Sequence, residues 1–444
     1  MSDPKPQSRI SFATRFGVIA ATAGSAVGLG NIWRFPYQAG NHGGGAFMLL
    51  YILFILILGI PVICAEFAIG RQGRSNIFGS FDRLSNRKGW KFTGYIGILA
   101  SLMILSFYSV VAGWTMEYFV QSLTGGLSAT SDMHGRFGEF CSGWRCVAYT
   151  VAFLAINFLI VRKGVRKGIE RMSSIMMPAL FVILFAFCIY SLTLPGARQG
   201  IDFLFNPDFS KIDSKVVIGA LGQAFFSLSL GLGCMLTYAS YFKDSTNILK
   251  NASMTAGLDT LVAILAGVLI FPAVFTFGAS PQEGPTLVFE VLPDIFNRLP
   301  AGWLLSALFF LMLFLASLTS TISMSEISTA FFSEQFGMSR RRSSTLTTAI
   351  CLVFGVLCAL SFGVLGNIPF FDFFNYFSSD ILLPVGGLLI CVFAGWIVDR
   401  KLLRNQLTNN GTTCVRFYKV LVFCIRYVAP VGLAVILAVG FGII

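Results

Sequence analysis

Polar residues that could bind a small ligand stand beside glycines in an apolar stretch near the N-terminus. Gly24, Gly28 and Gly30 are followed by Asn31 and Arg34. Glycine and asparagine are poor helix formers, and unwound backbone at membrane depth is tolerated only where it lines a cavity or is buried in protein. The amides and carbonyls freed by such a break can hold a small polar ligand. The alternative is close helix packing through small residues, which does not require Asn31 and Arg34.

A second interrupted stretch has the same features. Ser227 and Ser229 precede Gly231 and Gly233, so that Gly-Leu-Gly occurs at 28–30 and again at 231–233. Paired, glycine-interrupted hydrophobic segments in two halves of a chain are the best sequence indication of a secondary transporter's binding site. The pattern therefore favours solute binding inside the membrane.

Catalytic or channel chemistry finds no support in the sequence. His42 and His134 are the only histidines, and no spacing of His, Cys and carboxylates fits a zinc site. A channel would need a filter or a pore-lining ring, which is absent. Cys141 and Cys146 could form a bridge on the outer side or remain two buried thiols. We do not expect an enzyme.

The elements that position these residues follow from composition. The chain has 444 residues, of which 55% are hydrophobic and 12% charged, about half the charge of a soluble domain. Stretches of about 20 apolar residues can cross a membrane as helices, and runs of this length exclude the alternating strands of a barrel. Eleven such stretches are present, at 12–38, 46–69, 93–123, 143–161, 172–194, 215–241, 255–278, 302–333, 344–364, 371–398 and 417–442.

The sequence thus predicts an all-α integral membrane protein with eleven transmembrane helices, of which helices 1 and 6 are discontinuous. Five helices within 1–195 and five within 196–400 would form an inverted repeat, and 401–444 would add helix 11. The net charge of +12 comes from Lys and Arg concentrated at the N-terminus and in alternate loops. This bias predicts a cytoplasmic N-terminus and an external C-terminus. The charge therefore indicates a lipid bilayer and an orientation, and no nucleic-acid partner.

Several motifs resemble the neurotransmitter:sodium symporter family, in particular its bacterial amino-acid transporter branch. They are the stretch from Gly24 to Pro36, the Gly-Gly-Gly-Ala-Phe sequence at 43–47, the serines and glycines of 227–233, and 316–321. The resemblance implies sodium-coupled symport by alternating access in a bacterial inner membrane. A sensor that binds sodium and an amino acid without transporting them would carry the same motifs.

The resemblance implies two Na⁺ sites built from oxygen ligands. Site 1 would use Ala26, Asn31, Ser227 and Asp259, and site 2 would use Gly24, Val27, Ala316, Thr319 and Ser320. Taken alone, the hydroxyls at 319–321 could instead bond to their own helix. Inserting an acid such as Asp259 into a span costs roughly 2.5–3.5 kcal/mol. We expect its charge to replace chloride, so no chloride is expected.

The same resemblance assigns the substrate site and the gates. The substrate would contact Ser25, Ala26, Leu29, Gly30, Ile104, Tyr108, Phe226, Ser227, Ser229, Leu232, Ser320 and Met324. Gly24 stands where monoamine transporters carry an aspartate, which favours a neutral, hydrophobic or aromatic amino acid. An outer gate would pair Arg34 with Asp372, and an inner gate would pair Arg9 with Glu334, steadied by Tyr241. Glu66 would either accept hydrogen bonds from unwound backbone or snorkel to the interface. The protein is expected to be monomeric or weakly dimeric.

Overall fold

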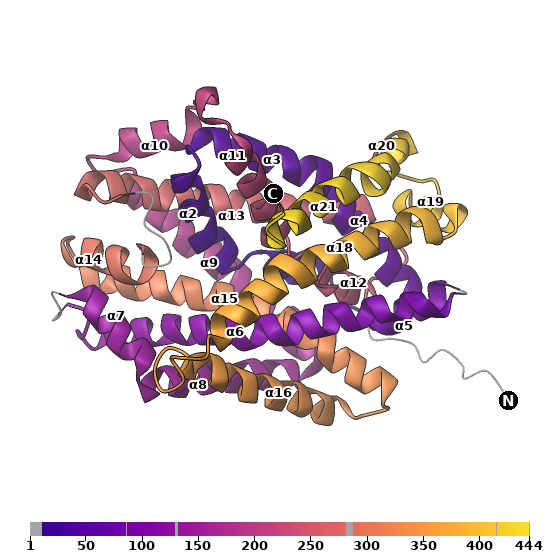
Figure 1. Cartoon of the computed structure of the whole chain (residues 1–444), viewed down its shortest axis with the longest axis horizontal. Helices are drawn as coiled ribbons and strands as arrows, with labels where there is room; N and C mark the ends of the chain where they lie inside the picture. The colour runs from indigo at the N-terminus through magenta and orange to yellow at the C-terminus, as the bar shows by residue number, and fades with distance from the viewer. Residues whose placement is uncertain (1–10, 86, 129–131, 281–286, 414, 444) are drawn as a thin grey trace.

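The computed structural model describes residues 11–85, 87–128, 132–280, 287–413 and 415–443, and within these ranges the chain is helical without strands (Figure 1). The longer helices are α1 (Arg15–Ala26), α3 (Gly45–Phe54), α4 (Ile60–Gly73), α6 (Phe92–Leu123), α7 (Met133–Ser142), α8 (Trp144–Val161), α9 (Arg171–Ser191), α11 (Ser214–Ser227), α13 (Ile248–Phe277), α15 (Gly302–Gln335), α16 (Arg340–Leu360), α18 (Leu383–Val392) and α21 (Ala429–Gly440).

Shorter elements connect or extend these helices. The short α-helices are α2 (Phe35–Asn41), α5 (Ile77–Leu84), α10 (Ala197–Phe205), α12 (Cys234–Ala239), α14 (Leu292–Asn297), α17 (Phe370–Tyr376), α19 (Arg400–Leu407) and α20 (Tyr418–Phe423). The π-helical turns are η1 (Gly30–Arg34), η2 (Ile55–Gly59), η4 (Val165–Glu170), η6 (Leu287–Val291), η7 (Phe377–Leu382), η8 (Phe393–Ile397) and η10 (Cys424–Val428), and the 3₁₀ turns are η3 (Lys88–Lys91), η5 (Phe209–Lys211) and η9 (Val415–Phe417).

Nine helical stretches among the described residues are long and apolar enough to cross a membrane, and a tenth is obtained if the bent pair 15–26 and 30–41 counts as one span. The remaining predicted span, 215–241, is occupied by α11 and α12, which are separated by 228–233. The all-helical membrane fold is confirmed. The count of eleven and the inverted repeat stay predictions.

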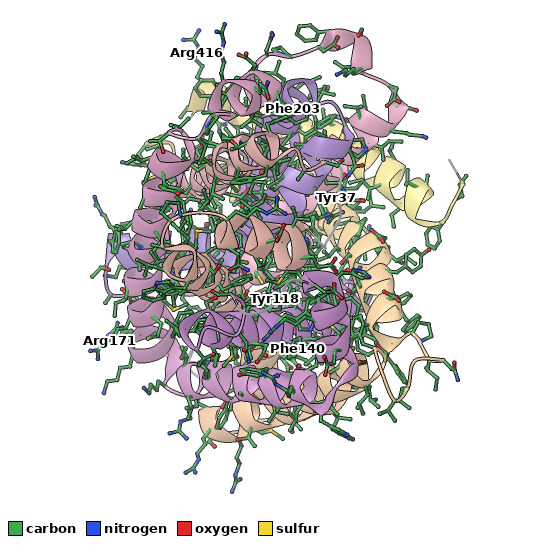
Figure 2. All side chains as sticks on the ribbon, turned by 90° about the vertical axis from the view of Figure 1, so that its left-hand side faces the viewer. Tyr37, Tyr118, Phe140, Arg171, Phe203 and Arg416 are labelled. Carbon is green, nitrogen blue, oxygen red and sulfur yellow. The ribbon has the colours of Figure 1, made fainter. Side chains whose placement is uncertain are left out.

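The helices that carry the predicted site pack together in the centre of the molecule. α15 contacts α1, α6, α9 and α12, while α13 contacts α1, α9 and η1. α6 also packs on α8 and α16, and α21 packs on α18 (Figure 1). At the periphery, by contrast, the charged side chains of Arg171 and Arg416 point away from the molecule (Figure 2). The site residues are therefore held by several helices far apart in sequence.

The first helix breaks where the sequence predicts it. α1 starts behind Thr14, whose hydroxyl accepts from the amide of Gly17 at 2.9 Å, as expected of an N-cap. It ends at Ala26, Val27 is extended, and the chain resumes at Gly30 with a bend of 50°. Close approach explains one glycine, because a Cβ on Gly28 would lie 2.5 Å from the Ser320 hydroxyl oxygen.

The second break depends on left-handed backbone. Gly231 and Gly233 have φ values of 81° and 84°, and Ser229 has 52°, a region that favours glycine. A Cβ on Gly231 would lie 2.2 Å from the carbonyl oxygen of Leu383. The freed amides of Gly231 and Leu236 donate to the Glu66 carboxylate at 2.9 and 3.2 Å. Glu66 is fully buried, so it is the acceptor for unwound backbone and does not snorkel.

The two outer cysteines are both buried free thiols. The indole nitrogen of Trp114 donates to the sulfur of Cys146 at 3.3 Å. The thiol alternative for Cys141 and Cys146 therefore holds in this structure.

Candidate functional site

A small cavity lies between the two helix breaks. Its walls are Ala26, Gly28, Gly30, Ile104, Tyr108, Phe226, Ser227, Ser229, Leu232, Ser320, Met324 and Leu383. All the predicted substrate residues except Ser25 and Leu29 are in this set, while Gly28 and Leu383 line the cavity without having been predicted. Leu383 follows an interrupted helix that the sequence analysis treated as continuous. The cavity volume is about 30 Å³, so an aromatic side chain can enter only if side chains such as Phe226 or Met324 move.

Ser25 and Leu29, the two predicted residues that do not line the cavity, form hydrogen bonds next to its wall. The amide of Leu29 donates to the Tyr108 hydroxyl at 2.9 Å, so this tyrosine faces the unwound backbone of the first break. The hydroxyl of Ser25 donates to that of Ser323 at 2.8 Å. Ser229 donates weakly to the carbonyl of Ser25, at 3.4 Å. Tyr108 and the amides near Leu29 can together bind a carboxylate.

Three of the four residues predicted for Na⁺ site 1, Asn31, Ser227 and Asp259, form one buried cluster, while Ala26 lines the neighbouring cavity. The Ser227 hydroxyl donates to one carboxylate oxygen at 2.5 Å, and Tyr51 donates to the same oxygen at 3.1 Å. The side-chain nitrogen of Asn31 donates to the other oxygen at 2.7 Å. The Asn31 oxygen accepts from the Gly28 amide at 3.0 Å. Tyr51 is a member of this cluster that the sequence analysis missed, because nothing distinguishes it from other aromatic residues in an apolar stretch.

The residues predicted for Na⁺ site 2 also lie together. The carbonyl of Val27 accepts from the hydroxyls of Ser320 at 3.1 Å and Thr319 at 3.5 Å. Thr319 donates as well to the Ala316 carbonyl, at 2.9 Å. A Cβ on Gly24 would be 3.3 Å from the Cβ of Thr319. The Thr319 hydroxyl therefore bonds to its own helix and also faces the break after α1. All the polar atoms in these contacts are oxygens.

The outer gate pair is not joined in this structure. Arg34 is half-buried, with its guanidinium carbon 4.2 Å from the centre of the Phe226 ring. Asp372 is exposed, and no ion pair within 4.0 Å links it to Arg34 among the described residues. The carboxylate whose charge acts on Arg34 is Asp380, one of the residues of η7. The Phe226 ring thus contacts the Arg34 guanidinium and also lines the cavity.

At the opposite end, Arg9 lies outside the described residues. Glu334 accepts from the Ser75 hydroxyl and from the backbone amide of Asn76, each at 2.8 Å. Tyr241 donates to Glu326 at 2.6 Å.

Glu326 was not assigned a role from the sequence. It forms a two-point ion pair with Arg340, with N–O distances of 2.8 and 2.5 Å. Arg340 also donates to the Val161 carbonyl at 2.8 Å. Glu326 is completely buried. The only sequence signal was an acid inside an apolar stretch, which names neither a partner nor a function.

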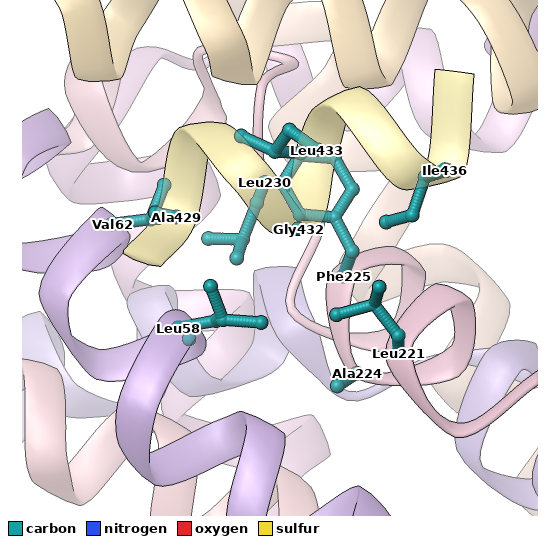
Figure 3. Close-up of a pocket in the computed structure, with 11 residues that line it drawn as sticks. Leu58, Val62, Leu221, Ala224, Phe225, Leu230, Ala429, Gly432, Leu433 and Ile436 are labelled. Atoms are coloured by element: carbon teal, nitrogen blue, oxygen red, sulfur yellow. The ribbon is translucent and has the colours of Figure 1, made fainter. Parts of the chain in front are cut away.

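A second, purely apolar cavity lies beside the site, between α11 and α21. Leu58, Leu221, Leu230 and Leu433 point toward one another there (Figure 3). Its volume is about 10 Å³, and it offers no polar group to a charged solute. The polar cavity between the breaks is the better candidate.

Comparisons with known proteins identify the family of the chain. The model of the sodium:neurotransmitter symporter family matches residues 9–146 and 142–443. An uncharacterized sodium-dependent transporter of Bacillus subtilis is 38% identical, over 98% of both chains. The sodium-dependent serotonin transporter of Drosophila melanogaster is 28% identical, over 97% of this chain and 76% of its own. The crystal structure of MhsT in complex with L-phenylalanine superimposes with a TM-score of 0.90 at 41% identity, covering 98% of this chain and 100% of MhsT.

These matches span nearly the whole chain. The family consists of transporters and not of enzymes, and it uses sodium. The chain belongs to the sodium:neurotransmitter symporter family and is a sodium-dependent, multi-pass membrane transporter.

Proposed function

We propose that this transporter moves a neutral, hydrophobic or aromatic amino acid into the cell together with two Na⁺ ions, by alternating access. The observation that carries the proposal is the convergence of two oxygen clusters on one cavity between two helix breaks. The substrate's carboxylate would bind Tyr108 and the amides near Leu29. Its ammonium group would meet backbone carbonyls of the opposite break.

The cavity wall supports a substrate without a charged side chain. Within the described part of the chain, no acidic or basic side chain lines the cavity. Ile104, Phe226, Leu232, Met324 and Leu383 would surround an apolar side chain, and methionine adapts readily to different shapes. The related MhsT was crystallised with L-phenylalanine, which is a substrate of this class.

Asp259 would provide the charge that balances Na⁺ at site 1. Hard cations prefer oxygen ligands, and the cluster offers the Asp259 carboxylate and the Ser227 hydroxyl. Rotating the Asn31 amide by half a turn would exchange its oxygen and nitrogen, which are nearly indistinguishable in shape. The amide oxygen would then face the ion. We expect transport to be independent of chloride, and uptake that drops when gluconate replaces chloride would contradict this.

Further parts of the proposal concern the gates and the membrane. Arg34 would close the outer path, with Asp372 and Asp380 as its available carboxylates, and Arg9 with Glu334 and Tyr241 would close the inner path. Two five-helix inverted repeats, 1–195 and 196–400, would rock about the site, with 401–444 outside them. The N-terminus would be cytoplasmic in a bacterial inner membrane, and the protein would be monomeric or weakly dimeric.

Sodium-driven uptake in proteoliposomes tests the function. Each of the twenty labelled amino acids is offered with an inward Na⁺ gradient, and choline replaces Na⁺ in the control. Accumulation of a hydrophobic or aromatic amino acid that collapses when the gradient is dissipated is the expected result. Counterflow addresses the sensor alternative, since a sensor exchanges no labelled amino acid across the membrane. Binding without counterflow would refute the proposal.

A further inference from the structure

A large cavity opens away from the substrate site, between the start of α1 and the start of α13. Its volume is about 490 Å³. It is lined by Phe12, Ala13, Thr14, Arg15, Val18, Ile19, Lys243, Ser245, Thr246, Asn247, Lys250, Asn251 and Met254. The positive-inside rule assigns this end of the molecule to the cytoplasm. None of these residues takes part in the proposed transport site.

The cavity is electropositive. Arg15, Lys243 and Lys250 line it, all three are exposed, and its walls contain no acid among the residues that the structure describes. α1 begins at Arg15 and α13 at Ile248, so the positive ends of both helix dipoles lie at its rim. An anion would therefore be attracted by side chains and backbone together.

The nearest acids are already engaged. Glu170 is buried and accepts from the amides of Ala13 and Thr14, at 2.9 and 3.0 Å. Asp244 is paired with Arg74. Among the described residues, Lys243 makes only a long hydrogen bond, 3.3 Å, to the Ala13 carbonyl. The positive charge in the cavity is left for an external ligand.

The other wall of the cavity is apolar. Val18 and Ile19 lie about one turn into α1, and Met254, which is 37% exposed, lies about two turns into α13. Both helices continue from here into the membrane. A charged mouth at the interface that continues into an apolar groove has the chemistry of a phospholipid, whose phosphate is polar and whose chains are not.

We propose that this cavity binds an anionic phospholipid, with its phosphate among Arg15, Lys243 and Lys250 and an acyl chain along Val18, Ile19 and Met254. A lipid seated there touches α1 and α13 at once. The start of α1 is also held by Phe12, whose ring packs edge-on against Tyr238 and Tyr241. The lipid therefore adds a second attachment for the segment that precedes the first helix break. The binding claim does not depend on the proposed substrate.

Direct binding to the purified full chain tests the proposal. The protein in nonionic detergent is titrated with short-chain phosphatidylglycerol, with phosphatidylcholine of the same chain length, and with inorganic phosphate, and bound lipid is counted by native mass spectrometry. Phosphatidylglycerol should be retained at low micromolar addition and phosphatidylcholine should not. Equal retention of both lipids would overturn the proposal.

Charge-matched variants locate the site. The triple replacement Arg15→Gln, Lys243→Gln and Lys250→Gln should weaken phosphatidylglycerol binding at least tenfold, since each cation near an anionic surface contributes about fivefold. The control replaces Arg162, Lys163 and Lys167 with Gln, which removes the same charge from exposed residues outside the cavity. Equal weakening in both variants would refute a specific site. If the triple variant does not fold, the three single replacements should each show the fivefold loss.

The apolar wall separates a lipid from a free anion. Met254→Asn, which adds no charge, should weaken phosphatidylglycerol binding while leaving any binding of inorganic phosphate unchanged. If inorganic phosphate competes as well as the lipid, and Met254→Asn has no effect on lipid binding, the cavity is an anion site and the lipid assignment is wrong. Loss of lipid binding together with normal sodium-driven uptake would leave the transport proposal intact.

Discussion

Replacing Asp259 with Asn tests whether a carboxylate holds Na⁺ at site 1. The substitution keeps size and shape while it removes the charge. Asn can still accept from Asn31, and its new amide nitrogen can donate to Ser227 and Tyr51, because hydroxyls accept as well as donate. The hydrogen bonds now seen at 2.7, 2.5 and 3.1 Å can therefore be replaced, and the variant should fold.

The expected loss is electrostatic. Two unit charges about 4 Å apart at an effective dielectric constant of about 20 interact by about 4 kcal/mol. The amide oxygen of Asn can still bind the ion. In addition, a neutral amide costs less to bury than a carboxylate, and this difference offsets part of the lost attraction. We take about half as the net effect, about 2 kcal/mol, which is about 30-fold in Na⁺ affinity.

The assay is a Na⁺ titration of amino-acid binding to the purified protein, with K⁺ holding ionic strength constant. Asp202→Asn is the matched control, because this carboxylate is 65% exposed and its ion pair with Arg198 is long, at 3.9 Å. The control should titrate like the wild type. A shift smaller than threefold in Asp259→Asn, with an unchanged melting temperature, would refute the role of the carboxylate.

Three other perturbations follow from the same structure. Arg34→Ala removes the guanidinium above the Phe226 ring, so uptake in proteoliposomes should fall to near background while the melting temperature holds; near-normal uptake would count against the outer gate. Glu326→Gln leaves Arg340 without its counter-ion, and because that arginine side chain is 27% exposed we expect a loss of about 2–3 kcal/mol, less than the 3–5 kcal/mol of a fully buried pair; thermal denaturation in detergent measures it, and no change would contradict the role of the pair. The protonated His134 ring donates to the Glu290 carboxylate across 2.8 Å, and this contact raises the pKa of that histidine. Because the pKa is raised in the folded state, the contact stabilises the fold fully at pH values below the unfolded-state pKa of about 6.5. This stabilisation is lost as the pH rises through the folded-state pKa. His134→Gln should therefore lower the melting temperature at about pH 5 and leave it unchanged at about pH 9.

The helix breaks could be predicted because their cause is local. Gly28 and Gly30 lower helix propensity at the point where α1 ends, and Gly231 and Gly233 supply the left-handed backbone that the second break needs. The polar residues beside these glycines indicate a binding site, because a polar side chain in an apolar stretch is costly to bury without a partner. The family resemblance then placed most wall residues of the cavity in one set, although Leu383 was absent from it.

Pairings between distant charges could not be predicted in the same way. Glu326 and Arg340 are fourteen residues apart, and they meet only because α15 and α16 pack side by side. Asp372 and Asp380 lie about two turns apart on an interrupted helix. Sequence spacing does not say which of them approaches Arg34, since the answer depends on how η7 turns the helix. Such choices belong to tertiary packing and not to local propensity.

The two proposed sodium sites differ in charge, and the difference indicates the order in which the ions would leave. Proposed site 1 contains the buried Asp259 carboxylate, so one Na⁺ there would be balanced within the protein. The predicted ligands of site 2 are the carbonyls of Gly24, Val27 and Ala316 and the hydroxyls of Thr319 and Ser320, all neutral. An amino acid carries no net charge as a zwitterion, so the ion at site 2 remains uncompensated in a low-dielectric interior, where an unpaired charge is costly. Because its ligands join α1 to α15, losing this ion loosens the contact between these helices. We therefore expect the ion at site 2 to leave first, and its departure to free α1 to move.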